Sequence, residues 1–281
     1  MAQTWLPTLP ALLLFAGFLL VPLLMTALLS FQESDRAGQV LPTLTLHNWR
    51  EIVDDEYYHG IFTRTLRIAL LVTGLAILLG APEAYILNRM RAPWRSRLLL
   101  VVLTPLLISV IARTLGWALL FGPSGPLSNL PVWLGLSREP IQFLFSETGI
   151  VVALTHVLTP FLVLSVWASL QRLDPSIEDA AASLGASRVT TFRRVILPQL
   201  LPGVLSGAII VFALAASAFA TPVIIGGRRL KVASALVYDE FIHQMNWPLG
   251  AGLSIVLLLS LGIATGVASR LVERRYAGGA K

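Results

Sequence analysis

Six blocks of about twenty mostly apolar residues restrict what this chain can fold into. They lie near residues 9–30, 65–87, 98–121, 150–170, 204–225 and 249–271. A helix of about 20 residues crosses the hydrocarbon core of a bilayer, whereas a soluble domain is built from shorter apolar runs or amphipathic stripes. Charged residues form only 13% of the chain, about half the share that is usual in soluble domains. The sequence therefore predicts an all-α integral membrane protein with six transmembrane helices.

The first apolar block does not have the features of a cleaved signal peptide. It lacks a basic segment in front of it, contains Pro10 and Pro22, and is not followed by a clear small-residue cleavage site after Phe31. We therefore expect it to remain in the protein as a transmembrane helix.

The basic residues indicate how the six helices are oriented. With six helices both termini lie on one side of the membrane, and the net charge is +6. The second and fourth connections and the C-terminal tail contain twelve basic residues: Arg89, Arg91, Arg95, Arg97, Arg172, Arg188, Arg193, Arg194, Arg270, Arg274, Arg275 and Lys281. The other connections hold fewer basic residues and most of the acidic ones. The positive-inside rule then predicts cytoplasmic termini, which explains the basic charge without any binding of nucleic acid.

The first outer connection, residues 32–62, is acidic. Its acidic residues are followed by the aromatic pair Tyr57 and Tyr58. Its six acidic residues are Glu33, Asp35, Glu51, Asp54, Asp55 and Glu56. Such a cluster can attract a cationic ligand or a docking protein. A solvated loop that simply follows the charge rule is the alternative, and the charge rule favours it.

The fourth connection, residues 171–202, has the pattern of a short helix at its start. Either Asp174 or Ser176 is suited to cap this helix, because a short polar side chain can accept a bond from an unpaired backbone N–H. One face of the helix carries an apolar stripe, made of Ile177, Ala181 and Leu184.

A glycine joins this helix to a second one. Gly185 has no Cβ and suits a left-handed C-cap. A second helix is expected from about Ser187 until Pro198 ends it, with one apolar face formed by Val189, Phe192 and Ile196. The composition leaves two alternatives open: an elbow onto which a partner protein docks, and an amphipathic hairpin that lies on the lipid.

The spacing of the motif residues decides between these alternatives. This connection contains three motif segments at fixed spacing. Asp179-Ala180-Ala181 is followed after three residues by Gly185, and after nine more by Val195-Ile196-Leu197-Pro198. This arrangement resembles the EAA loop of the permease subunits of ABC importers, in which Glu-Ala-Ala, three residues, Gly and nine residues precede Ile-x-Leu-Pro. Asp179 stands where Glu is usual and Val195 where Ile is usual, and both changes are conservative.

The resemblance implies the transmembrane domain of a type I ABC importer in the bacterial inner membrane. It also implies cytoplasmic ABC ATPase subunits, a second homologous permease subunit and a periplasmic substrate-binding protein as partners, with membrane lipid around the helices. The residues implied to couple the permease to the ATPase are Glu178, Asp179, Ala180, Ala181, Gly185, Leu197 and Pro198.

Weaker matches extend the resemblance over residues 46–271. They lie at residues 115–117, 219–222, 226–227 and 246–250. They resemble the spermidine/putrescine-type branch, which implies a polyamine or a related amino compound as the solute. The implied domains are an N-terminal helix with a periplasmic loop (1–60), the permease domain with its coupling loop at 171–202 (61–271) and a cytoplasmic tail (272–281).

The chain contains no motif for catalysis or for binding ATP or a metal. A phosphate-binding loop needs a Gly-Lys pair, and the only lysines are Lys231 and Lys281, outside any such context. The histidines are scattered, and no hydrolase motif is present. We therefore expect no enzyme activity and no cofactor in this chain, with ATP and Mg on a partner ATPase. A stand-alone secondary transporter is the alternative, but it would show inverted repeats and coupling carboxylates, which we do not find.

Three ionisable residues fall within the predicted spans, where charge is costly and a functional role is the default hypothesis. Arg113 either lines the substrate path or pairs with a carboxylate, which could be that of Glu147 or of an acidic residue in the partner subunit. Glu83 either contacts a cationic substrate or reaches the inner headgroups. His156 either contacts the substrate or bonds a backbone carbonyl left free by Pro160.

Overall fold

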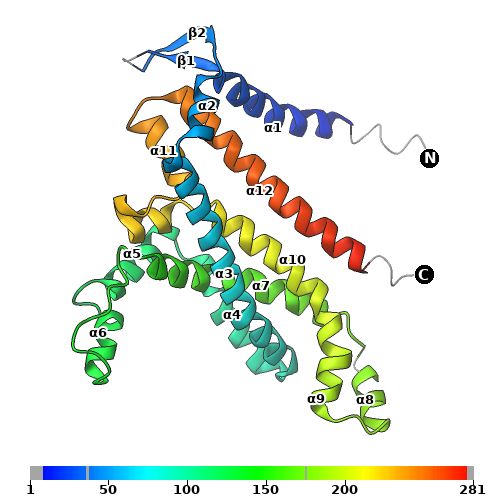
Figure 1. Ribbon diagram of the computed structural model, residues 1–281. Coiled ribbons are helices and arrows are strands. Elements are labelled where there is room, and N and C mark those ends of the chain that lie inside the picture. The colour runs from blue at the N-terminus through cyan, green and yellow to red at the C-terminus, as the bar shows by residue number, and fades with distance from the viewer. Residues whose placement is uncertain (1–8, 36–37, 175, 277–281) are drawn as a thin grey trace. The chain divides into compact units, whose positions relative to one another are not determined.

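The computed structural model describes residues 9–35, 38–174 and 176–276, and the described chain is almost entirely helical (Figure 1). The elements up to the middle of the chain are α1 (Leu9–Leu29), β1 (Gln32–Ser34), β2 (Val40–Leu44), α2 (His47–Asp54), α3 (Glu56–Arg89), α4 (Ala92–Leu107), α5 (Val110–Phe121) and α6 (Pro126–Trp133). The later elements are α7 (Glu147–Leu170), α8 (Ser176–Ser183), α9 (Arg188–Thr191), the π-helix η1 (Phe192–Ile196), α10 (Leu197–Ala216), the π-helix η2 (Pro222–Gly226), the 3₁₀-helix η3 (Gly227–Arg229), α11 (Ala233–Ile242) and α12 (Trp247–Tyr276).

Five helices of the described chain are long and apolar enough to cross a membrane. They are α1, α3, α7, α12 and the run Arg188–Ala216, which combines α9, η1 and α10. A sixth span is formed if the pair made by α4 and the segment Val110–Trp133 counts as one, although the two parts meet at a bend of 96°. The described chain therefore has five continuous candidate spans, and the third predicted span is present only as this bent pair.

The break in the third span corrects the prediction of one continuous helix over residues 98–121. Ile108 is extended, with φ −91° and ψ 140°, and ends α4. Pro105 lies in the last turn of α4 and cannot donate a helical hydrogen bond, so this turn is weaker than its apolar composition indicates.

Two further boundaries differ from the prediction. The fifth span was expected to run to residue 225, but α10 ends at Ala216, where the Ser217 hydroxyl donates to the Ala213 carbonyl at 2.8 Å and the regular helix stops. The second helix of the fourth connection was expected to end at Pro198. Instead Pro198 lies in the first turn of α10, where its missing N–H costs nothing, and a wide turn in which the Leu197 N–H bonds the Phe192 carbonyl precedes it.

The chain forms two compact units. The first unit comprises the residues up to Thr63 and Ala233–Ser260, and the second comprises Arg64–Val232 and the residues from Leu261.

In the first unit the first outer connection is folded, and its acidic residues Glu33, Asp54, Asp55 and Glu56 are exposed to solvent. Strands β1 and β2 pair antiparallel, with Ser34 opposite Val40. Asn48 of α2 donates to the carbonyl oxygens of Ser30 and Gln32 at 3.0 and 2.8 Å, which joins α2 to the end of α1. A hydrophobic core holds this unit together and consists of Ile52, Tyr58, Ile61, Ala233, Leu236, Leu249 and Leu253.

The second unit is built around α7, which has the largest buried share of the candidate spans, 67%. Helix α10 packs closely on α7 at Gly203 and Gly207, a Gly-x-x-x-Gly pair. The Ser165 hydroxyl of α7 donates to the Gly203 carbonyl at 2.8 Å. A Cβ on Gly203 would lie 2.3 Å from the hydroxyl oxygen of Ser169, so only glycine permits this approach.

Candidate functional site

The fourth connection folds as the helix–glycine–helix elbow that the sequence predicts, and residues 171–202 are called the elbow below. Helix α8 ends at Ser183, and Gly185 follows with φ +81°, in the left-handed region. The Ser187 hydroxyl then accepts a bond from the Thr190 N–H at 3.3 Å and caps α9. Local sequence signals were sufficient here, because each cap is formed by residues within three positions of the helix it ends or begins.

Of the two predicted caps of α8, the structure shows the interaction of Asp174. Its Oδ1 atom accepts a bond from the Ser176 N–H at 2.9 Å. This bond favours the charged carboxylate and lowers the pKa of Asp174. Pro175, between them, lies outside the described residues.

The elbow is attached to the end of α3, a connection that the sequence analysis missed. Arg89 of α3 forms an ion pair with Glu178 of α8. The guanidinium also lies over the Tyr85 ring, 4.7 Å from its centroid. Tyr85 in turn packs edge-to-face on Phe192 of η1, with ring centroids 5.3 Å apart.

A second polar contact supports the same attachment. The Gln171 side chain donates from Nε2 to Oδ1 of Asn88 at 2.7 Å. The two segments enclose a cavity of about 350 Å³ between them. No short-range motif announces these contacts, since Arg89 and Glu178 are 89 residues apart in the chain.

The predicted coupling residues occupy different environments on the elbow. Glu178 faces α3 through its ion pair, Ala180 is exposed and Ala181 is half-buried. Leu197 and Pro198 are exposed in the first turn of α10. The side chain of Asp179 lies outside what the structure describes.

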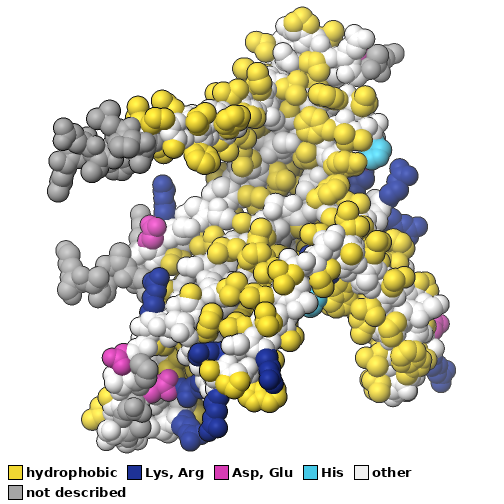
Figure 2. All heavy atoms as spheres, turned by 180° about the vertical axis from the view of Figure 1, so that it is seen from behind, with side chains coloured by type: hydrophobic (Ala, Val, Ile, Leu, Met, Phe, Trp, Pro, Cys, Tyr) yellow, Lys and Arg dark blue, Asp and Glu magenta, His cyan; other side chains and the backbone are white. Residues whose placement is uncertain are grey.

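The predicted apolar stripe is only partly covered by the chain. Ala181 of α8 is half-buried, whereas Leu184, just after α8, is 89% exposed and Val189 of α9 is 66% exposed. Figure 2 shows basic side chains gathered around the elbow, whereas hydrophobic side chains cover most of the remaining face. The elbow thus offers apolar side chains in a basic surround, a combination suited to a protein partner.

Glu83 and His156, two of the candidates for the substrate path, line one cavity of about 430 Å³ among α3, α4, α5 and α7. His156 does not bond a carbonyl near Pro160 as expected. Its Nδ1 atom accepts a bond from the Nε1–H of Trp117 at 3.3 Å. A ring contact accompanies this bond, with centroids 5.3 Å apart. Trp117 therefore orients His156, and this role was not apparent from the sequence.

Arg113, the third candidate, lines a separate cavity of about 320 Å³. Its guanidinium donates to the Pro105 carbonyl across the break between α4 and α5. Glu147, the candidate in this chain for neutralising Arg113, pairs with other residues. Glu147 begins α7 and forms ion pairs with Arg67 and Arg64, at 2.5 and 3.5 Å.

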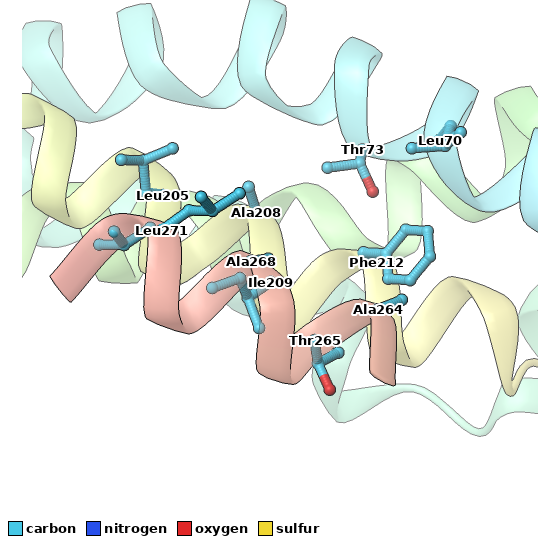
Figure 3. Close-up of a pocket in the computed structure, with 11 residues that line it drawn as sticks. Leu70, Thr73, Leu205, Ala208, Ile209, Phe212, Ala264, Thr265, Ala268 and Leu271 are labelled. Carbon is cyan, nitrogen blue, oxygen red and sulfur yellow. The ribbon is translucent and has the colours of Figure 1, made fainter. Parts of the chain in front are cut away.

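A further groove, of about 730 Å³, is lined by α3, α10 and α12 (Figure 3). Its labelled side chains are apolar except for Thr73 and Thr265. Both hydroxyls donate to carbonyls of their own helices at 2.7 Å, to Ala69 and Leu261. The groove is therefore better suited to apolar groups, such as lipid chains or apolar side chains, than to a polar solute.

The apolar spans, the elbow and the charged cavities define a multi-pass membrane protein of the transport permease class. The chain belongs to the family of binding-protein-dependent transport system inner membrane components, whose model matches residues 142–278. It is the permease subunit of an ATP-driven ABC importer, and the alternative of a stand-alone secondary transporter is set aside.

Relatives and solved structures agree with this assignment. The chain is 30% identical over 261 residues to the spermidine/putrescine transport system permease protein PotB of Escherichia coli strain K12, covering 92% of this chain and 94% of PotB. It is 30% identical over 251 residues to the inner membrane ABC transporter permease protein YdcU of the same strain, covering 84% and 79%. Its fold matches a chain in the crystal structure of a bacterial ABC transporter that imports the acidic polysaccharide alginate, with a TM-score of 0.76, 18% identity and coverage of 96% and 94%.

Proposed function

We propose that this permease translocates a polyamine or a related amino compound across the inner membrane, with both termini in the cytoplasm. The similarity to PotB over 92% of the chain supports the solute class. The twelve basic residues of the second and fourth connections and the tail support the orientation. A periplasmic binding protein delivers the solute from the other side.

The observation that carries the coupling part of the proposal is the elbow. Its exposed Leu184 and Val189 offer apolar contact area to an ATPase subunit, and the left-handed Gly185 sets the angle between the two helices that carry them. The run Arg188–Ala216 continues from the elbow into a span without interruption. A displacement of the elbow therefore moves this span directly.

A second connection transmits the same displacement to α3. The Arg89–Glu178 ion pair and the Tyr85–Phe192 ring contact join the elbow to the last turns of that helix. One elbow thus acts on two spans when the ATPase subunits close on ATP.

ATP and Mg bind the partner ATPase subunits, since this chain has no phosphate-binding loop. One elbow engages one ATPase subunit, and such importers use two, so a second homologous permease subunit supplies the other elbow. The exposed side chains of α1, none of whose described residues is buried, then face lipid or this partner.

The proposal that the solute is a cation has one specific alternative. Arg113 is a positive charge within the predicted spans, and a zwitterionic or anionic amino compound would suit it better than a polyamine. Glu83 and Trp117 favour a cation.

Uptake by the reconstituted complex tests the proposal. Proteoliposomes containing both permease subunits, the ATPase and the binding protein are given labelled putrescine or spermidine, in competition with amino acids. We expect ATP-dependent uptake of the amine and no effect of acidic competitors. Absence of polyamine uptake, together with uptake of an acidic solute that Arg113→Gln abolishes, would overturn the cation assignment.

A further inference from the structure

We propose that the cavity among α3, α4, α5 and α7, called the Glu83 cavity below, binds an ammonium group of the solute during translocation, with Glu83 as its counter-ion. This inference rests on the proposed function and names the site where the cation is held. The cavity volume of about 430 Å³ falls in the range of sites for small ligands.

Glu83 is the residue with a carboxylate in the lining of this cavity. Among the described residues it has no ion pair or hydrogen bond. A lone carboxylate within a membrane span is costly unless water or a cation reaches it. The Glu83 cavity is therefore best explained as a water-accessible space that a cation can enter.

The neighbouring hydroxyl groups are already hydrogen-bonded within their own helix, so Glu83 is the polar group in the lining that can bind a cation. Thr155 and Thr159 also line the cavity, but each donates at 2.7 Å to a carbonyl of α7, those of Val151 and Thr155. Arg113 lines a different cavity, although its guanidinium donates to the carbonyl of Pro105, a residue of this lining.

Trp117 and His156 complete the lining for a cation. Because the Nδ1 atom of His156 accepts the bond from Trp117, the imidazole carries its proton on Nε2 and is neutral. A neutral ring does not repel an ammonium group. The Trp117 indole adds an aromatic face, the side chain type that attracts cations most strongly.

Cysteine labelling tests the electrostatic potential in the Glu83 cavity and does not require transport. The chain has no cysteine, so the complex with the unaltered chain reports the background. Val152→Cys places a thiol in the cavity lining, and Ala208→Cys places a matched thiol in the apolar groove of α3, α10 and α12. Each variant is treated with a trimethylammonium and a sulfonate methanethiosulfonate reagent.

We expect the cationic reagent to react faster than the anionic one at Val152→Cys. Adding Glu83→Gln should reduce this ratio by about tenfold, because one negative charge focuses cations into a cleft. Putrescine should protect the thiol only when Glu83 is present. The thiol at residue 208 should show neither effect. A ratio that Glu83→Gln leaves unchanged, or an unreactive thiol at both Val152→Cys and the second lining variant Val102→Cys, overturns the inference.

Uptake separates this inference from the proposed function. With the full complex, Glu83→Gln should raise the KM for putrescine, whereas Glu139→Gln, which neutralises an exposed acid outside the cavity, should not. If the unaltered complex imports no amine, the proposed function fails, and the labelling ratio still reports the charge of the cavity. If it imports amines and Glu83→Gln leaves both KM and the labelling ratio unchanged, only the Glu83 cavity is refuted.

Discussion

Gly185 is the residue through which the proposed coupling depends on backbone conformation. It has φ +81°, and a Cβ built on it would meet no heavy atom within 4 Å. A Cβ added there therefore strains the backbone without colliding with another part of this chain. This separation makes Gly185 a clean test of the elbow.

Gly185→Val should reduce substrate-stimulated ATP hydrolysis and uptake while the protein still inserts into the membrane. A β-branched residue in the left-handed region costs about 1–2 kcal/mol, which the elbow avoids by changing shape. Gly185→Asn is the matched control, because Asn adopts this conformation more readily. Stimulation that is normal in the Val variant would refute the role of the elbow angle.

Asp174 gives the elbow a defined response to pH. Its folded-state pKa is lowered from 3.8, so its stabilising bond to the Ser176 N–H is fully present above that ordinary value. The bond is lost as pH falls through the lowered pKa.

We expect the amides of α8 to exchange faster with solvent at a pH below the lowered pKa of Asp174 than at neutral pH, after correction for intrinsic rates. Asp174→Asn retains an acceptor that does not titrate and should remove this pH dependence. Hydrogen exchange with mass spectrometry on peptides covering α8 measures both. An unchanged pH dependence in the Asn variant would exclude Asp174 as the titrating cap.

At the scale of elements, two sets of contacts join the spans to one another and to the elbow. One is the packing of α7 on α10 at Gly203 and Gly207, and the other is the attachment of the elbow to α3. The first concerns the two spans that flank the elbow in the chain. The second joins a span that precedes them.

Gly203→Ala should destabilise the helix pair by about 1–3 kcal/mol, as overpacking of a close contact usually does. Its Cβ would lie 2.3 Å from the Ser169 hydroxyl oxygen and 2.9 Å from the Ser165 carbonyl oxygen, and the carbonyl cannot rotate away. Gly74→Ala in α3 meets nothing within 4 Å and is the control. Thermal unfolding in detergent should show a lower Tm for Gly203→Ala than for the unaltered protein, and no decrease for Gly74→Ala. Equal Tm values for the two variants would contradict the close packing of α7 and α10.

Reversing one charge of the Arg89–Glu178 pair should weaken coupling more than it weakens folding. Both side chains are nearly half exposed, so the pair itself contributes about 0–1 kcal/mol to stability. Arg89→Glu and Glu178→Arg should each lower substrate-stimulated ATP hydrolysis by about fivefold, the ratio that corresponds to about 1 kcal/mol.

The double reversal restores an ion pair and should recover most of the stimulation. Basal ATP hydrolysis serves as the control for assembly with the ATPase. A double variant that is as impaired as the two single ones would show that Glu178 acts by contact with the ATPase and not through Arg89.

For the whole molecule, the sequence alone was sufficient for features that depend on local chemistry. Each span needs about 20 apolar residues whatever its neighbours are, so the six blocks are visible without a structure. The left-handed Gly185 and the caps at Asp174 and Ser187 likewise involve residues that are close in the chain. The motif spacing of the elbow was for the same reason enough to indicate the family.

Tertiary structure decided every feature that depends on partners far apart in the chain. Glu147 pairs with Arg67, 80 residues away, and not with Arg113, because helix packing rather than chain order determines which charges meet. His156 bonds Trp117 of another helix instead of a carbonyl near Pro160. The 96° break after α4 lies within one apolar block, so hydropathy alone does not reveal it. Composition specifies how many helices enter the membrane, whereas only their packing specifies which polar groups face one another there.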